Sequence, residues 1–154
     1  HRSMPELSIV DVRVFNYFSH TQNMNARFLI TDIVRAIKNK EVFKTLADNV
    51  IRDFITPPDF YRLIQAIIDF KPINTALDCY TKSPISKFDL LANLKVKFGL
   101  QYQVDQLASV VNATGVKVNY YSKNNSLQAI KYMAKYSSLE GLIKEISIFI
   151  TSHE

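Results

Sequence analysis

Glycine is scarce in this sequence: the 154 residues include three, Gly99, Gly115 and Gly141. A glycine-rich loop that holds phosphate groups needs several glycines close together, because its backbone must approach the ligand closely. These three lie too far apart for that. The sequence therefore contains no such loop.

Cysteine and histidine are also rare, with one cysteine, Cys79, and three histidines, His1, His20 and His153. One cysteine cannot form an internal disulfide, and these four residues lack the spacing of metal ligands. We expect Cys79, within the strand-like run "ALDCYT", to be a small buried residue. Such cysteine use favours a reducing, cytoplasmic compartment.

Long apolar runs are absent, since lysine or aspartate interrupts each one after a few residues. We therefore expect no transmembrane span and no signal peptide. A hydrophobic content of 47% and a charged content of 21% are typical of a folded globule. The length predicts a single domain over residues 1–154.

The net charge of +5, together with eight tyrosines and ten phenylalanines, leaves one binding hypothesis open. A stand-alone basic module for nucleic acid or another anionic ligand would have this composition. However, the lysines are scattered over the predicted helices and form no single stripe. Solvated surface is therefore the favoured interpretation, and nucleic acid is the weaker one.

The hydrophobic pattern alternates between strands and helices, which indicates α/β or α+β layering. Three predicted helices begin with capping boxes: Thr56 with Asp59, Ser86 with Asp89, and Ser137 with Glu140. Apolar residues at helical spacing predict helices over 27–40, 57–68, 86–98 and 137–150. Runs of β-branched and aromatic residues predict strands over 9–18, 41–46, 49–55, 76–81, 100–105 and 116–122. A short helix is predicted over 124–133.

Several of these segments, taken in order, resemble one family. "VRVFNYF" (12–18) is followed by "RDFITPPDFYRLIQAII" (52–68) and "INTALDCYTKSPISKFDLLANLKVKFGL" (73–100). The last segment, "VNYYSKNNSLQAIKYMAKYSSLEGLIKEISIFI", includes the characteristic "SLEGL". The ordered set resembles the C-terminal, substrate-binding part of extended short-chain dehydrogenases/reductases, the NAD-dependent sugar-nucleotide epimerases and dehydratases.

The resemblance implies a nucleotide-sugar substrate and a role for particular residues. Asn16, in the "FN" pair, is expected to contact the sugar or the diphosphate, and Arg52 is expected to bind the diphosphate with its forked guanidinium. Asp53 is expected to brace that region. The loop over 23–28 lies where the family holds the nucleotide, which makes Arg27 a further candidate.

Each of these residues also has a purely structural alternative. Asn16 could end a strand by satisfying local backbone groups. Arg52 and Asp53 could form an ordinary surface ion pair. Arg27, like Arg13, is expected to be structural or solvated.

The catalytic half of the family pattern is absent from these residues. The family's cofactor fingerprint and its Tyr-x-x-x-Lys pair precede the "FN" strand, and none of the eight tyrosines has lysine four positions later. The resemblance therefore implies a C-terminal lobe with no catalytic residue and no cofactor of its own. NAD or NADP would belong to the intact enzyme, whose Rossmann sheet strands 9–18 and 76–81 would join. Unpaired strand edges also lead us to expect a homodimer.

Overall fold

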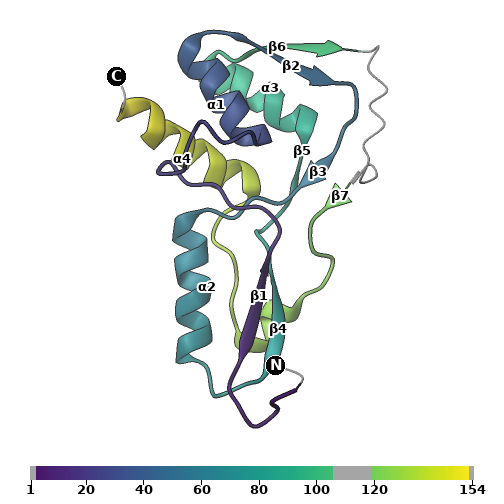
Figure 1. Ribbon diagram of the computed structural model, residues 1–154, viewed down its shortest axis with the longest axis vertical. Coiled ribbons are helices and arrows are strands. Elements are labelled where there is room, and N and C mark those ends of the chain that lie inside the picture. The colour runs from purple at the N-terminus through teal and green to yellow at the C-terminus, as the bar shows by residue number, and fades with distance from the viewer. Residues whose placement is uncertain (1–2, 106–118, 153–154) are drawn as a thin grey trace.

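The computed structural model describes residues 3–105 and 119–152, and Figure 1 shows their arrangement. In chain order the elements are β1 (Val10–Val14), α1 (Leu29–Asn39), β2 (Val42–Leu46), β3 (Ile51–Arg52), α2 (Pro57–Asp69), β4 (Thr75–Cys79), β5 (Ile85–Ser86), α3 (Lys87–Phe98), β6 (Gln101–Asp105), β7 (Asn119–Tyr120), the 3₁₀ helix η1 (Ser126–Ile130) and α4 (Ser138–Thr151). This mixture of strands and helices confirms the α/β class.

The lower part of the molecule in Figure 1, called the lower region below, contains β1, β4, α2 and η1. β1 and β4 pair in parallel, with Val12 opposite Leu77. α2 lies beside this pair and buries Leu63 completely. The buried residues of the lower region's apolar cluster come from α2, β4, η1 and the chain beside them: Ile55, Leu63, Leu77, Cys79, Leu127, Ile130 and Tyr132. Val10 and Val12 of β1 are partly buried and pack against this cluster.

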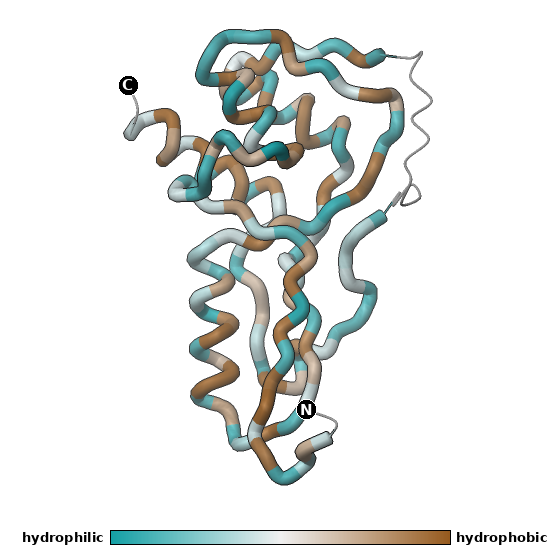
Figure 2. Tube along the Cα trace, viewed as in Figure 1, coloured by the Kyte–Doolittle hydropathy of each residue, from teal (hydrophilic) through white to brown (hydrophobic). Residues whose placement is uncertain are grey.

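The upper region contains α1, α3, α4 and the parallel pair β2–β6 (Figure 1). Its apolar cluster draws on all three helices, and the most deeply buried members are Ile33, Val34, Leu91, Leu94, Leu142 and Ile146. In Figure 2 the helices of this region alternate hydrophobic and hydrophilic segments, as expected where each helix turns one stripe toward a shared core.

The two regions meet at short strands and at one crossing of the chain. β3 lies between β5, which runs antiparallel to it, and β7, which runs parallel. Next to this small sheet, the Phe18 N–H donates to the Ile55 carbonyl (3.1 Å) and the Ile55 N–H donates to the Asn16 carbonyl (3.0 Å). The chain after β1 is thereby fixed to the chain after β3.

The helices occupy the predicted stretches, but several strands are shorter than predicted. The strand expected over 49–55 is only Ile51–Arg52. The strand expected over 116–122 lies partly outside the described residues, and within them it is Asn119–Tyr120. Residues 9–18 were expected to form one strand, whereas β1 ends at Val14. The chain leaves β4 there and takes a new partner, because Tyr17 forms a bridge with Ile55. The strand expected over 76–81 is Thr75–Cys79, and the short helix expected over 124–133 is the 3₁₀ turn Ser126–Ile130.

Of the three predicted capping boxes, the one at Ser137 and Glu140 is confirmed, the one at Ser86 and Asp89 is confirmed in its serine half only, and the one at Thr56 and Asp59 is wrong. The hydroxyl groups of Ser86 and Ser137 accept from the N–H three residues later. At α2, however, the Thr56 side chain makes no capping hydrogen bond. Asp59 is buried and accepts instead from the N–H groups of Lys135 (3.0 Å) and Tyr136 (2.8 Å). Its carboxylate fixes the chain before α4 to the first turn of α2.

Two further expectations can be compared with the described residues. Cys79 is buried on β4, as predicted. None of the described helices is long and apolar enough to cross a membrane.

Candidate functional site

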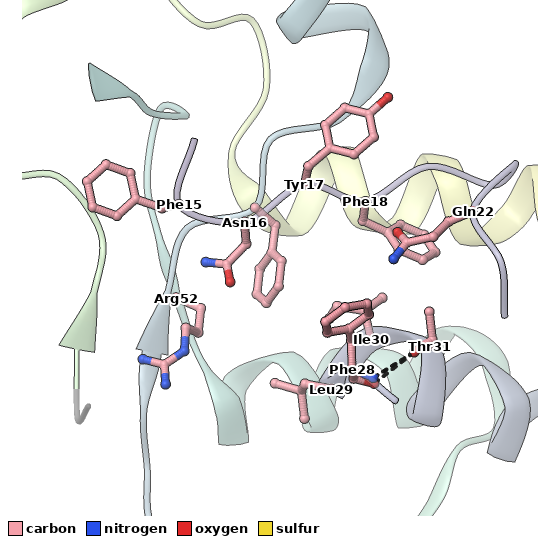
Figure 3. A pocket seen from close by; sticks show the side chains of 11 residues that line it. Phe15, Asn16, Tyr17, Phe18, Gln22, Phe28, Leu29, Ile30, Thr31 and Arg52 are labelled. Atoms are coloured by element: carbon pink, nitrogen blue, oxygen red, sulfur yellow. Dashed lines mark hydrogen bonds between the residues drawn. The ribbon is translucent and has the colours of Figure 1, made fainter. Parts of the chain in front are cut away.

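A cavity of about 310 Å³ lies where the two regions meet. It is bounded by the chain after β1, the start of α1 and the short strand β3 (Figure 3). Its walls contain aromatic, amide and aliphatic side chains and one charged side chain, that of Arg52: Phe15, Asn16, Tyr17, Phe18, Gln22, Phe28, Leu29, Ile30, Thr31, Arg52 and Phe54. The lining is thus mostly apolar with few polar groups, as in many small-molecule sites.

Arg52 reaches this cavity from the middle strand of the small sheet. In the strand register it stands between Ile85 of β5 and Tyr120 of β7. Its guanidinium lies 5.9 Å from the centre of the Tyr120 ring, and its Nη1 donates to the Ile51 carbonyl at 3.2 Å. Partial burial lowers the pKa of Arg52, while the carboxylate of Asp48 opposes that shift. The side chain remains a cation at neutral pH.

Asn16 lies on the same side of the cavity as Arg52 in Figure 3, with Gln22 and Thr31 on the opposite side. Its Nδ2 donates to the backbone carbonyl of Asp53 at 2.9 Å. The acceptor is 37 positions away in sequence, so the backbone group that Asn16 satisfies belongs to a distant segment and not to its own strand. Asn16 connects the chain after β1 to the chain after β3 and lines the cavity.

Asp53 points away from solvent and is 4% exposed. Its carboxylate accepts from the Thr81 N–H (3.0 Å), from the Thr81 hydroxyl (2.5 Å) and from the Ser138 hydroxyl (2.7 Å). The Ser138 hydroxyl accepts in turn from the Phe54 N–H at 2.9 Å. A surface ion pair with Arg52 is therefore the wrong interpretation, and the bracing role expected of Asp53 is confirmed.

The first turn of α1 forms another wall of the cavity, through Leu29, Ile30 and Thr31. The free N–H groups at a helix start favour an anion. The preceding residue, Phe28, cannot cap with its side chain, but its N–H donates to the Thr31 hydroxyl at 3.1 Å. Phe28 is 61% exposed at the cavity, so an apolar ring lies beside these amides. The sequence carried no usual N-cap residue that would have indicated this wall.

The loop between β1 and α1 is held from two helices. The buried carboxylate of Glu145 in α4 accepts from the His20 N–H (3.0 Å) and lies 2.7 Å from His20 Nδ1. At the other end of the loop, Arg35 of α1 donates to the carbonyls of Met24 and Ala26. Sequence reasoning missed Glu145, because it falls within the apolar stripe of its helix.

The structure brings together two of the three predicted site residues. Asn16 and Arg52 line the same cavity, although they are 36 positions apart. Arg27 is exposed and is not among the residues lining this cavity, although the next residue, Phe28, is. The described residues contain no group of three or more His, Cys, Asp or Glu side chains that could hold a metal ion.

Comparisons with known proteins give a fold and no closer relative. No protein-family model matches the chain, and no curated protein matches it. Among solved structures, UDP-glucuronic acid 4-epimerase from Bacillus cereus, in complex with UDP-glucuronic acid and NAD, matches with a TM-score of 0.78 and 17% identity. The match covers 97% of this chain and 47% of that one.

Two further structures match in the same way. UDP-glucose 4-epimerase from Thermotoga maritima with UDP-glucose has a TM-score of 0.74 at 16% identity, covering 94% of this chain and 47% of that one. dTDP-glucose 4,6-dehydratase from Bacillus anthracis with NAD has a TM-score of 0.73 at 12% identity, covering 94% and 45%. The chain spans about half the length of these structures. Its fold is therefore that of about half of a Rossmann-type sugar-nucleotide epimerase or dehydratase, as the sequence motifs led us to expect.

Proposed function

We propose that this chain is the substrate-binding part of an NAD-dependent sugar-nucleotide epimerase or dehydratase. The observation that carries the proposal is the cavity in which Arg52 and Asn16 meet at the start of α1. A nucleoside diphosphate sugar combines an anionic diphosphate with a flat base and a polar sugar. The cavity combines a cation and helix amides with aromatic rings and side-chain amides, which complements that chemistry.

The diphosphate is the group that Arg52 and the first turn of α1 are suited to hold. A guanidinium presents parallel N–H donors to two phosphate oxygens, and a partly buried one is less screened by solvent. Asn16 supplies an amide oxygen next to Arg52, while its Nδ2 is engaged by the Asp53 carbonyl. Asn16 therefore orients the wall and can accept a hydrogen bond from a sugar hydroxyl.

Hydride transfer requires groups outside these 154 residues. In the proposal, a Rossmann half supplies the NAD or NADP site and the Tyr-x-x-x-Lys acid/base pair, and it continues the sheet beyond β1. In the described residues β1 pairs with β4 alone, and Val14 on β1 is 38% exposed. Such a strand invites pairing with another chain or domain, which includes a second copy in a homodimer. The buried thiol of Cys79 suits the reducing cytoplasm.

Binding of UDP-glucose to the 154-residue chain, measured by calorimetry, tests the proposal. We expect the wild-type chain to bind with no turnover, and Arg52→Ala to weaken binding at least tenfold, because a charge-assisted contact is lost. Arg27→Ala removes the same charge outside the cavity lining and serves as the matched control. Equal loss in the two variants, or epimerisation by the chain alone, would contradict the proposal.

The same preparation separates this function from the basic-module alternative. Binding to single-stranded nucleic acid is measured across a series of salt concentrations. Sub-micromolar affinity that falls steeply with salt, without measurable UDP-glucose binding, would favour the alternative.

A further inference from the structure

Glu145 is a buried carboxylate in the apolar stripe of α4, and it holds the loop between β1 and α1. The residue is 2% exposed, and two other members of the stripe, Leu142 and Ile146, are fully buried. Its Oε2 accepts from the His20 N–H at 3.0 Å and lies 2.7 Å from His20 Nδ1. An apolar side chain would fill this position without the cost of burying a charge. Stability alone therefore does not account for Glu145, which indicates that its hold on His20 serves the loop.

His20 belongs to a tight turn that ends at the cavity. The Gln22 N–H donates to the Ser19 carbonyl at 3.0 Å and closes the turn. Inside it, the Thr21 N–H donates to Ser19 Oγ at 3.2 Å, and the hydroxyl groups of Ser19 and Thr21 lie 2.9 Å apart. Phe18, just before the turn, and Gln22, at its end, both line the cavity. Because Glu145 binds the turn at its second residue, it fixes where Gln22 stands.

The Gln22 side chain offers an acceptor that the chain itself does not use. Its Oε1 is buried, and no donor among the described residues bonds to it. Nearly all buried acceptors in proteins are paired, and an unpaired one costs stability. This one belongs to the cavity wall, on the side opposite Arg52 (Figure 3). A buried acceptor in such a wall is suited to a donor that a ligand brings.

We infer that Gln22 Oε1 accepts a hydrogen bond from an O–H or N–H group of the ligand, and that Glu145 is the positioning residue that holds it there through His20. The inference rests on the proposed function, because it concerns the same cavity. With the diphosphate on Arg52, the donor belongs to one of the two groups that the diphosphate joins, the sugar or the nucleoside. Both present the same chemistry to Gln22, and two ligands separate them.

Calorimetry with the full 154-residue chain compares UDP-glucose with UDP in wild type and in Gln22→Met, which keeps the length of the side chain and removes its amide. We expect Gln22→Met to weaken UDP-glucose binding about tenfold, because the ligand's donor enters the cavity without an acceptor. A loss for UDP-glucose alone assigns the donor to the sugar, and an equal loss for UDP assigns it to the nucleoside. Gln103→Met, at an exposed position of β6, removes the same group elsewhere and should leave both affinities unchanged. Unchanged binding of both ligands in Gln22→Met would overturn the inference.

Glu145 is tested by two substitutions that differ in one property. Leucine fills the apolar stripe but accepts no hydrogen bond, whereas glutamine keeps an acceptor. We expect Glu145→Leu to weaken binding as much as Gln22→Met does, Glu145→Gln to bind like wild type, and the double variant Gln22→Met/Glu145→Leu to lose nothing further. A merely structural role would lower the affinity together with the melting temperature, whereas Glu145→Leu should lower the affinity alone. Full affinity in Glu145→Leu, or a further loss in the double variant, would overturn the positioning role.

A substitution in the loop gives the same test from the exposed side, should Glu145→Leu not fold. His20→Ala removes the ring contact with Glu145 and leaves the backbone N–H in place. It should weaken UDP-glucose binding about threefold, because part of the hold on the turn remains. Unchanged affinity in a folded His20→Ala variant would then overturn the positioning role.

Two measurements on the unliganded chain separate this inference from the proposed function. Gln22→Met should raise the melting temperature by about 2–4 °C, because it removes a buried acceptor that has no donor. Glu145→Leu, unlike Glu145→Gln, should speed amide hydrogen exchange at His20 and Gln22. If wild type binds neither UDP-glucose nor UDP but both changes are seen, the proposed function fails and the role of Gln22 as an acceptor held by Glu145 stands. An unchanged or lower melting temperature in Gln22→Met would show that the fold already satisfies the amide, which would overturn the inference.

Discussion

The upper and lower regions bury their apolar residues in different ways. In the upper region α1, α3 and α4 enclose one cluster, and Leu91 and Leu94 of α3 are fully buried within it. In the lower region the cluster lies against the two strands β1 and β4, which pair only with each other among the described residues. The comparison shows that one region closes its own core and the other lies against a small, open sheet. The cavity forms at their junction, a usual position for ligand sites.

Truncating one leucine in each region is the strongest way to test this difference. We expect Leu91→Ala to cost about 4 kcal/mol of unfolding free energy, because a closed core cannot relax into the space that is left. Leu63→Ala, in the lower region, should cost about 2.5 kcal/mol, because α2 can shift over a narrow sheet. Urea unfolding followed by circular dichroism measures both.

The matched control is Val96→Ala, on the outer face of α3, where the side chain is 89% exposed. It should change the unfolding free energy by less than about 0.5 kcal/mol. Equal costs for Leu91→Ala and Leu63→Ala would contradict the comparison, since they would show that the lower core is as confined as the upper one.

Much of the fold could be predicted from the sequence, because local rules and the tertiary structure agree. The helices follow their apolar periodicity, and Ser86 and Ser137 cap as their spacing predicts. Predictions failed where distant segments compete for the same group. Asp59 looked like a local cap, but it binds backbone N–H groups more than 70 positions away.

The candidate site was predicted less completely, for the same physical reason. Asn16 and Arg52 came from motif resemblance, and their convergence on one cavity is a tertiary fact. Phe28 and Glu145 carry no sequence signal for their positions, since one is an apolar N-cap residue and the other is a buried carboxylate within the apolar stripe of its helix. Burial of a carboxylate is decided by its partners, and the partner of Glu145 is His20, which lies 125 positions away.

Asp53 joins the two regions, and its removal should have the next largest effect. Asp53→Ala leaves the donors at Thr81 and Ser138 without their acceptor, which should cost about 3 kcal/mol. The loss should appear as earlier hydrogen exchange near both residues. Asp89→Ala is the control, because it removes an exposed carboxylate in the first turn of α3 that accepts from the Ser86 hydroxyl, and it should cost about 1 kcal/mol or less. Exchange that changes on one side of the junction only would argue against a joint role.

Gly141 is a second contact between the regions, with a smaller expected effect. A Cβ at this position of α4 would lie 2.8 Å from Thr56 Oγ1 and 3.1 Å from Thr56 Cγ2. An exposed helical Gly→Ala change gains up to about 1 kcal/mol, but overpacking here should reverse the sign and cost about 1–2 kcal/mol. Thermal unfolding of Gly141→Ala, with and without Thr56→Ala, measures this. A stable single variant, or no rescue in the double variant, would contradict the close contact.

The smallest effect concerns Cys79, in the lower cluster, and it appears only in alkali. Desolvation, with smaller contributions from the carboxylates of Asp53 and Asp59, raises the pKa of the thiol to about 12. The folded state therefore prefers the protonated thiol. Its contribution is complete below the unfolded pKa of about 8.5 and is lost at about 1.4 kcal/mol per pH unit as the pH rises toward 12. From pH 8 to pH 9.5 the unfolding free energy of the wild type should therefore fall by about 1.3 kcal/mol more than that of Cys79→Ala. Iodoacetamide should label Cys79 at pH 8 only after the chain unfolds. Rapid labelling of the folded chain would show that the lower cluster opens readily. That result would sharpen the contrast between the lower cluster and the closed upper core.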